Sequence, residues 1–169
     1  MRFSQVERVL DALDARGVRC WVAGGWGVAA LIGRQSRPHR DLDLVIDHED
    51  LDACRSVLEG LGYTVETDWL PTRVEMALPP DAWVDVHPLR FQQGGRASLP
   101  LPDGTAMDYP PGVFTTGRLR GRVIPCLSAE QQRAVHRGYE PKGNDLHDLA
   151  QLDLLLDRGR VVRGPGPGS

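Results

Sequence analysis

The stretch from Gly24-Gly25-Trp26-Gly27 to Asp41-Leu42-Asp43 decides the fold of this chain. A short, mostly apolar segment over 19–23 precedes the glycines and predicts a buried strand. The double glycine predicts a turn into a short helix that ends near Gly33, and the run over 41–46 predicts a second strand. Glycines allow backbone N–H groups to approach phosphate closely at a helix N-terminus, although a double glycine is also common in ordinary turns.

Asp41 and Asp43 form a pair of carboxylates at the start of the second strand. Side chains alternate along a strand, so both aspartates face the same side, with Cα atoms roughly 6.5 Å apart. Such a pair can share one metal ion or two ions about 3.5–4 Å apart, and Mg²⁺ prefers carboxylate oxygens completed by phosphate and water. Exposed aspartates are also frequent in strands and turns, so the spacing alone leaves both interpretations open.

Asp85 is the third acidic candidate, because it lies inside the apolar run Trp83-Val84-Asp85-Val86-His87. A lone charge in a buried strand is costly unless it is paired or bound to metal. If this strand neighbours the first pair, three carboxylates converge; the alternative is an edge strand whose polar face meets solvent. His87 should face the same way as Asp85, and Glu75 lies on the preceding strand; both are candidate substrate contacts.

The remaining pattern predicts an α/β (α+β) domain with a mixed sheet of about five strands flanked by helices. Ser4 and Ser128 each begin a capping-box pattern and so predict helix starts. The region 88–112 is rich in glycine and proline and is expected to be the least regular. Further expected elements are helices over 48–61 and 145–158 and strands over 63–67, 73–78, 82–87 and 122–126. Residues 1–160 are expected to form one domain, followed by a disordered tail over 161–169.

Composition narrows the class of protein. The 169 residues contain 41% hydrophobic and 25% charged residues and carry a net charge of −3, as in a globular protein without an obvious basic patch for nucleic acid. Three widely spaced cysteines predict reduced thiols, which suits the cytoplasm. No apolar run approaches the roughly 18 residues that a membrane span requires.

The motifs together resemble the antibiotic nucleotidyltransferases of the polymerase β-like nucleotidyltransferase superfamily. The resemblance covers most of 5–155, is closest to the lincosamide nucleotidyltransferases and extends to the aminoglycoside 2″-nucleotidyltransferases. It implies a nucleotidyltransferase fold with C-terminal helices, and transfer of a nucleoside monophosphate to a hydroxyl of a small antibiotic with release of pyrophosphate. The segments that carry it are Gly24-Gly25-Trp26-Gly27, Arg37-x-His39-x-Asp41-x-Asp43, Val84-Asp85-Val86-His87-Pro88 and Asn144-Asp145-x-x-Asp148.

The resemblance also implies roles for individual residues. Asp41, Asp43 and Asp85 match metal ligands, with two Mg²⁺ ions expected, and Asp85 matches the general base. The co-substrate is ATP or another nucleoside triphosphate, and family resemblance favours ATP. Residues that match contacts to the nucleotide are Gly24, Gly25, Arg37, His39, Tyr139, Lys142 and Asp145. Relatives often have Lys where this chain has Asn144, which weakens the match of Lys142.

Two other functions remain open at this point. One is a toxin–antitoxin type of nucleotidyltransferase that modifies protein or tRNA. Those enzymes usually carry Gly-Ser in place of Gly24-Gly25, and Ser where this chain has Arg40. The other is a non-catalytic nucleotide-binding module, against which the three aspartates argue, since a pure binder needs no base. The expected partners are a nucleotide and a small hydroxylated acceptor, without nucleic acid or membrane, and a homodimer could complete the cleft.

Overall fold

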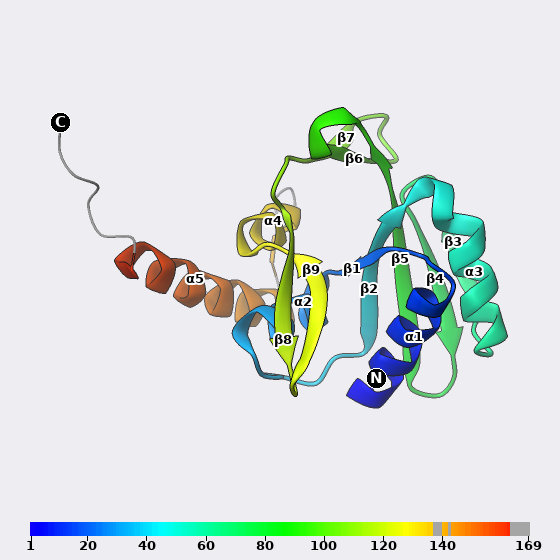
Figure 1. The fold of residues 1–169 in the computed structure, drawn as a ribbon, viewed down its shortest axis with the longest axis horizontal. Helices are drawn as coiled ribbons and strands as arrows, with labels where there is room; N and C mark the ends of the chain where they lie inside the picture. The colour runs from blue at the N-terminus through cyan, green and yellow to red at the C-terminus, as the bar shows by residue number, and fades with distance from the viewer. Residues whose placement is uncertain (137–139, 142, 163–169) are drawn as a thin grey trace.

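The computed structural model describes residues 1–136, 140–141 and 143–162. Its centre is a mixed sheet in the order β3-β4-β5-β2-β1-β9-β8, with a β6–β7 hairpin continuing from the end of β5 (Figure 1). The β2–β5 and β1–β9 pairs are parallel, and the other pairs are antiparallel. The strands are β1 (Cys20–Val22), β2 (Asp41–Asp47), β3 (Thr64–Trp69), β4 (Arg73–Leu78), β5 (Ala82–Phe91), β6 (Ala97–Pro100), β7 (Ala106–Tyr109), β8 (Phe114–Leu119) and β9 (Arg122–Leu127).

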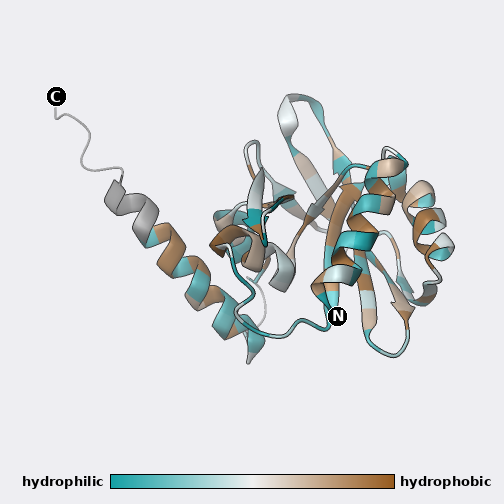
Figure 2. Ribbon diagram, turned by 60° about the horizontal axis from the view of Figure 1, so that its bottom comes forward, coloured by the Kyte–Doolittle hydropathy of each residue, from teal (hydrophilic) through white to brown (hydrophobic). Residues whose placement is uncertain are grey.

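Helices pack against the sheet, and the last helix projects beyond one end of it (Figure 1). The helices are α1 (Phe3–Ala15), α2 (Gly24–Ile32), α3 (Leu51–Gly60), α4 (Ala129–Val135) and α5 (Asn144–Val162). Apolar side chains of α1 and α3 join one core with those of the central strands, and Figure 2 shows hydrophobic colour concentrated on these strands. A separate small cluster joins Val28 of α2, Ala129 of α4 and Leu152 of α5. No helix in the described part of the chain is long and apolar enough to cross a membrane.

Strand periodicity explains how β2 and β5 serve both core and site. Leu42 and Leu44 of β2 and Val84 and Val86 of β5 are fully buried in the core beneath α1 and α3. The intervening residues of both strands face the opposite side of the sheet, because successive side chains alternate. The same alternation that builds the core therefore brings the aspartates together on the other face.

The two predicted helix starts had different outcomes. Ser128 is confirmed as the N-cap of α4, because its hydroxyl accepts a hydrogen bond from the N–H of Gln131 at 3.3 Å. The prediction for Ser4 is wrong: α1 begins at Phe3 with Arg2 as N-cap. The Gln5 side chain accepts from the Arg2 N–H at 2.6 Å, which satisfies the helix start two residues earlier than the sequence pattern suggested.

The mixed sheet flanked by helices is confirmed, but within the described part of the chain it has nine strands instead of about five. The extra strands include β6 and β7, which lie in the region expected to be least regular. They are short, and Pro100 ends β6, so no alternating pattern long enough to detect exists there. Helix α5 extends to Val162, beyond the predicted end at 158. Residues 163–169 lie outside the described residues, so the disordered tail and the single domain over 1–160 stay predictions.

Candidate active site

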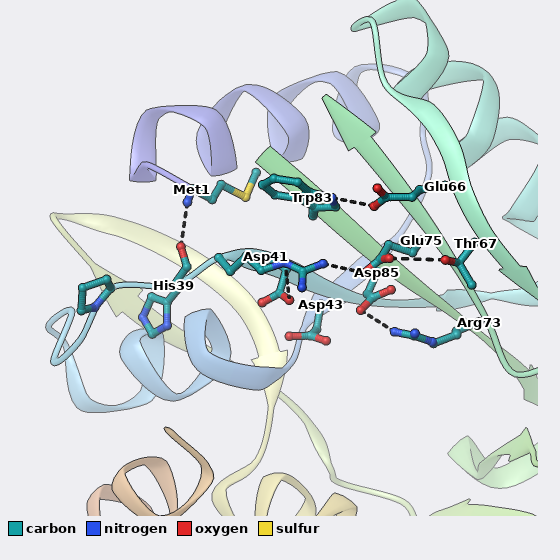
Figure 3. Close-up of polar contacts among 12 residues, drawn as sticks. Met1, His39, Asp41, Asp43, Glu66, Thr67, Arg73, Glu75, Trp83 and Asp85 are labelled. Atoms are coloured by element: carbon teal, nitrogen blue, oxygen red, sulfur yellow. Dashed lines mark hydrogen bonds and ion pairs between the residues drawn. The ribbon is translucent and has the colours of Figure 1, made fainter. Parts of the chain in front are cut away.

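Three carboxylates form a row across neighbouring strands (Figure 3). In the strand register, Asp43 of β2 lies opposite Asp85 of β5, and Glu75 of β4 lies opposite Asp85 on the other side. Asp41 lies two residues before Asp43 and so shares its face. The predicted neighbourhood of the two aspartate-bearing strands is confirmed. The edge-strand alternative for Asp85 is wrong, because β5 is paired on both sides.

Basic side chains accompany these carboxylates. The Asp85 Oδ2 accepts a hydrogen bond from Arg73 Nη1 at 2.8 Å, and Glu75 Oε2 accepts one from Arg40 Nη2 at 3.1 Å. His87 Nε2 lies 3.7 Å from Asp43 Oδ1. As the side chains stand, no group of three or more His, Cys, Asp or Glu residues in the described chain is arranged to hold a metal ion. Asp85 turns one of its oxygens to Arg73.

The electrostatics of the row nevertheless fit a cation. Burial raises the pKa of Asp85 to about 6, and the charge of Asp43 adds to this effect. Burial, followed by the charge of Asp43, also raises the pKa of Asp41. The Asp85 Oδ1 is buried and has no hydrogen-bond partner within the described residues. Closely spaced carboxylates with an unpartnered oxygen are the donors that Mg²⁺ prefers, so the residues present fit this ion.

A cavity of about 640 Å³ opens beside the aspartate pair. Its polar lining includes the predicted site residues Gly24, Gly25, Arg37, Asp41, Asp43, His87 and Asp145. Its apolar lining residues are Val45, Leu99, Met107, Tyr109, Leu127 and Val135, together with Ala23. The predicted residues His39, Glu75 and Asp85 are buried and are not part of the lining. Tyr139 and Lys142 lie outside the described residues.

The double glycine is explained by close packing. Gly24 has a φ of +54°, and a Cβ there would overlap the Asp43 carboxylate. A Cβ at Gly25 would overlap the ring of His39 and the guanidinium of Arg37. Both residues belong to the first turn of α2, where backbone N–H groups have no partner inside the helix. The glycines therefore bring an aspartate and a helix N-terminus to the same cavity, an arrangement that suits a metal-bound phosphate.

Comparison with known proteins agrees with this geometry. Residues 5–152 match the aminoglycoside-2″-adenylyltransferase family. The chain belongs to this family. It is 33% identical to a lincosamide resistance protein from Staphylococcus haemolyticus over 87% of this chain and 91% of that protein. It is 28% identical to a 2″-aminoglycoside nucleotidyltransferase from Escherichia coli, over 74% of this chain and 67% of that protein.

A solved structure shows the same fold. The lincosamide antibiotic adenylyltransferase LnuA, with lincomycin bound, superposes with a TM-score of 0.83 at 30% identity, covering 92% of this chain and 98% of LnuA. The predicted membership among the antibiotic nucleotidyltransferases and the predicted fold are thus confirmed. The chain is an enzyme of the nucleotidyltransferase type.

In this nucleotidyltransferase, the buried ring of His39 packs against Gly25 and against Trp26 of α2. Its ring lies 4.5 Å from that of Trp26, and the residue is 4% exposed. Neither ring nitrogen has a hydrogen-bond partner among the described residues. Burial, aided by the charge of Arg37, lowers the pKa of His39 to about 4, so the ring is neutral at pH 7. Its predicted role near the triphosphate stays a prediction.

Sequence reasoning missed several residues of the site. Asp148 is 3% exposed and holds Arg37 through two hydrogen bonds, 2.9 Å to Nε and 2.5 Å to Nη2, which raises the pKa of Arg37. Asp148 stood in a motif that carried the family resemblance, yet no role was predicted for it. Arg73 could have been found from the hairpin register, because it precedes Glu75 by two residues and so shares its face. The apolar wall from β6 and β7 left no comparable signal.

Proposed function

We propose that this enzyme transfers AMP from ATP to a hydroxyl group of a small antibiotic, with Mg²⁺ bound and pyrophosphate released. The observation that carries the proposal is the shared cavity: the N-terminus of α2 and the Asp41–Asp43 pair open onto the same space. A nucleotide triphosphate with its metal ion needs both a phosphate-binding helix end and carboxylate ligands. The acceptor class follows from the relatives, which are a lincosamide resistance protein and 2″-aminoglycoside nucleotidyltransferases.

The chemistry divides among the residues of the cavity. Mg²⁺ held by Asp41 and Asp43, with Asp85 as the third ligand, would neutralise charge on the triphosphate. The free N–H groups at the start of α2 bind phosphate oxygens, and Arg37 supplies positive charge from the cavity wall. Asp85, which lies next to Asp43 in the strand register, accepts the proton of the acceptor hydroxyl. The acceptor oxygen then bonds to the α-phosphorus, and the bond to pyrophosphate breaks.

The polar and apolar lining residues suit different substrates. The polar residues bind the triphosphate, and the apolar residues Leu99, Met107 and Tyr109 contact the acceptor. His87 lies on the wall between Val45 and Arg73 and is well placed for the acceptor, whereas Glu75 is engaged by Arg40 and buried. A lincosamide-like or aminoglycoside-like molecule therefore places its reactive hydroxyl near Asp85 while its apolar groups face β6 and β7.

The direct test is a panel of lincosamides and aminoglycosides incubated with ATP and Mg²⁺. The expected result is a mass increase of one drug class by one AMP, together with pyrophosphate release. Pyrophosphate release with any small acceptor would exclude a non-catalytic nucleotide-binding module. If labelled ATP instead marked protein or tRNA in a cell extract and no drug gained mass, the small-molecule acceptor would be wrong.

The role of Asp85 is tested separately. Asp85→Asn keeps the size of the side chain but removes the proton acceptor, so turnover should fall by about 100-fold or more while ATP binding persists. Asp41→Asn should instead weaken Mg²⁺-dependent ATP binding, measured by calorimetry. Near-normal turnover in Asp85→Asn would reject the base assignment, and unchanged metal-dependent binding in Asp41→Asn would reject that metal ligand.

A cytoplasmic location and a homodimer remain part of the proposal. ATP as co-substrate requires access to the cytoplasmic nucleotide pool. Light scattering on the purified protein measures the oligomeric state, and a mass equal to one chain would reject the dimer.

A further inference from the structure

We propose that Arg73 is a positioning residue for the reaction, because its hydrogen bond to one oxygen fixes the orientation of the Asp85 carboxylate beside Asp43. This inference rests on the function proposed above. Arg73 is the first residue of β4, and it faces the carboxylate row from the position diagonal to Asp85. Its Nη1 donates to Asp85 Oδ2 at 2.8 Å, whereas Oδ1 has no partner among the described residues.

The structure fixes Arg73 from several directions. Its guanidinium carbon lies 4.5 Å from the centre of the Trp69 ring, which supports the cation on one face. The turn before β4 is anchored by the Thr72 hydroxyl, which donates to the Pro100 carbonyl at 2.9 Å. Arg73 also lines the cavity with a side chain that is 25% exposed. The guanidinium is therefore held in place before any substrate binds, while it remains next to the reacting groups.

The charge pattern gives Arg73 a specific task. Asp85 stands between Asp43 and Glu75 in the row of carboxylates, so a negatively charged side chain flanks it on each side. Arg40 pairs with Glu75, so within the described residues Arg73 is the only basic side chain that forms an ion pair with Asp85. Its hydrogen bond restricts rotation of the carboxylate and neutralises part of its charge.

Loss of Arg73 should thus affect metal binding and turnover in opposite directions. Without the guanidinium, both oxygens of Asp85 become available to a divalent cation beside Asp43, so the cation should bind more strongly. The freed carboxylate rotates, however, and no longer keeps a fixed orientation toward the acceptor. A merely structural role would weaken both properties together, because a disordered β4 would loosen the whole row. The opposite signs distinguish positioning from structural support.

The experiment measures Mn²⁺ affinity and turnover in Arg73→Gln and Arg73→Lys. Mn²⁺ is titrated in the presence of a non-hydrolysable ATP analogue, and turnover is followed as pyrophosphate release with the active drug. In Arg73→Gln, Mn²⁺ should bind about tenfold more tightly while kcat falls by about tenfold or more, as expected for a lost charge-assisted hydrogen bond. Arg73→Lys keeps the charge, so Mn²⁺ affinity should stay near that of the wild type while kcat falls.

A matched control and a double mutant make the result specific. Arg96→Gln removes the same charge from an exposed ion pair with Asp108, outside the cavity lining, and should change neither property. In an Asp85→Asn background, Arg73→Gln should no longer tighten Mn²⁺ binding. A tightening that persists without the Asp85 charge would show a general field effect and overturn the proposal.

The outcomes separate this inference from the proposed reaction. If the wild type releases pyrophosphate and both Arg73 variants match its kcat, Arg73 has no positioning role and the proposed function stands. If no drug supports turnover but Arg73→Gln tightens Mn²⁺ through Asp85, the acceptor class is wrong and the coupling of Arg73 to Asp85 stands. If Arg73→Gln does not fold, Arg73→Lys decides, and wild-type kcat in that variant overturns the inference.

Discussion

The absence of a single side-chain atom controls how closely α2 approaches β2, and Gly24 is the residue that shows this most clearly. Its backbone adopts a φ of +54°, and the space of a Cβ is filled by the carboxylate of Asp43. Two requirements thus coincide at one position: a left-handed conformation and the absence of a side chain. The aspartate of β2 and the first turn of α2 can meet only because this residue is glycine.

Gly24→Ala should therefore impair ligand binding beyond its effect on stability. The left-handed conformation costs about 1 kcal/mol for alanine, and the added methyl group also displaces Asp43. We expect Mg²⁺-dependent ATP binding to weaken by about tenfold or more, measured by calorimetry.

Gly33→Ala is the matched control. Gly33 also has a positive φ, of +78°, but the nearest atom to its Cβ position is 3.8 Å away. This variant should lose similar stability and keep ATP binding. Equal ATP affinity in the two variants would show that the approach of Asp43 does not matter.

At the scale of elements, side chains of α5 bind the loop that precedes β2. Asp148 binds Arg37, His147 Nε2 lies 3.0 Å from the Ser36 hydroxyl, and Gln151 accepts from Arg34 at 3.2 Å. All three contacts come from about one turn of α5. The helix therefore orients Arg37, and through it one wall of the cavity, from a segment more than 100 residues away along the chain.

Asp148→Asn should weaken the contact between α5 and this loop. Removing one partner of a buried ion pair leaves an uncompensated charge, which costs about 2–4 kcal/mol here because Arg37 lines the cavity and keeps some contact with water. Urea unfolding measures the loss. Asp153→Asn on the same helix breaks an exposed pair with Arg133, 3.0 Å apart, and should cost less than about 1 kcal/mol. Equal losses would contradict the special role of the buried pair.

The contact between α2 and β8 depends on another glycine. A Cβ at Gly117 of β8 would overlap the backbone of Ala30 in α2, and backbone cannot move aside as a side chain can. Gly117→Ala should destabilise the protein by about 1–3 kcal/mol through overpacking. Gly60 at the end of α3 has open space around its Cβ position, so Gly60→Ala should be neutral or stabilising. Thermal melts of both variants measure these two effects on stability.

For the whole molecule, the core determines how the thiols respond to pH. Burial raises the pKa of Cys54 to about 12 and that of Cys126 to about 11. Both residues are fully buried, and all three cysteines are free. Above about pH 9, thiols of the unfolded chain release protons that the folded chain retains. The stability that the two buried thiols contribute to the folded state is therefore complete below about pH 9. It is lost as the pH rises through their folded-state pKa values of about 11 and about 12.

Alkylation with iodoacetamide at pH 8.5 tests this expectation. Mass spectrometry should show Cys54 and Cys126 unmodified in the folded protein and rapidly modified after unfolding in guanidinium. Modification of both thiols in the folded protein at the rate of the unfolded chain would show that the core does not protect them.

Much of this organisation could be predicted from local sequence. The alternation in β2 and β5 identified both core leucines and site aspartates, because a strand determines facing direction with a period of two. The turn before α2 and the start of α4 at Ser128 were visible through glycine and capping chemistry. The extra strands β6 and β7 were missed, because their short, proline-containing segments become strands only by pairing with the end of β5.

The sequence by itself determined which side chains share a face of each strand, and, through its motifs, the family to which the chain belongs. Only the tertiary structure decided which charges meet. It placed Arg73 on Asp85, Arg40 on Glu75 and Asp148 on Arg37. These pairs join residues 12 to 111 positions apart, and such contacts depend on strand register and helix docking, which no local pattern encodes. The aspartates were evident from the sequence and the hairpin pattern could have placed Arg73 on their face, but only the folded sheet showed that its guanidinium holds Asp85.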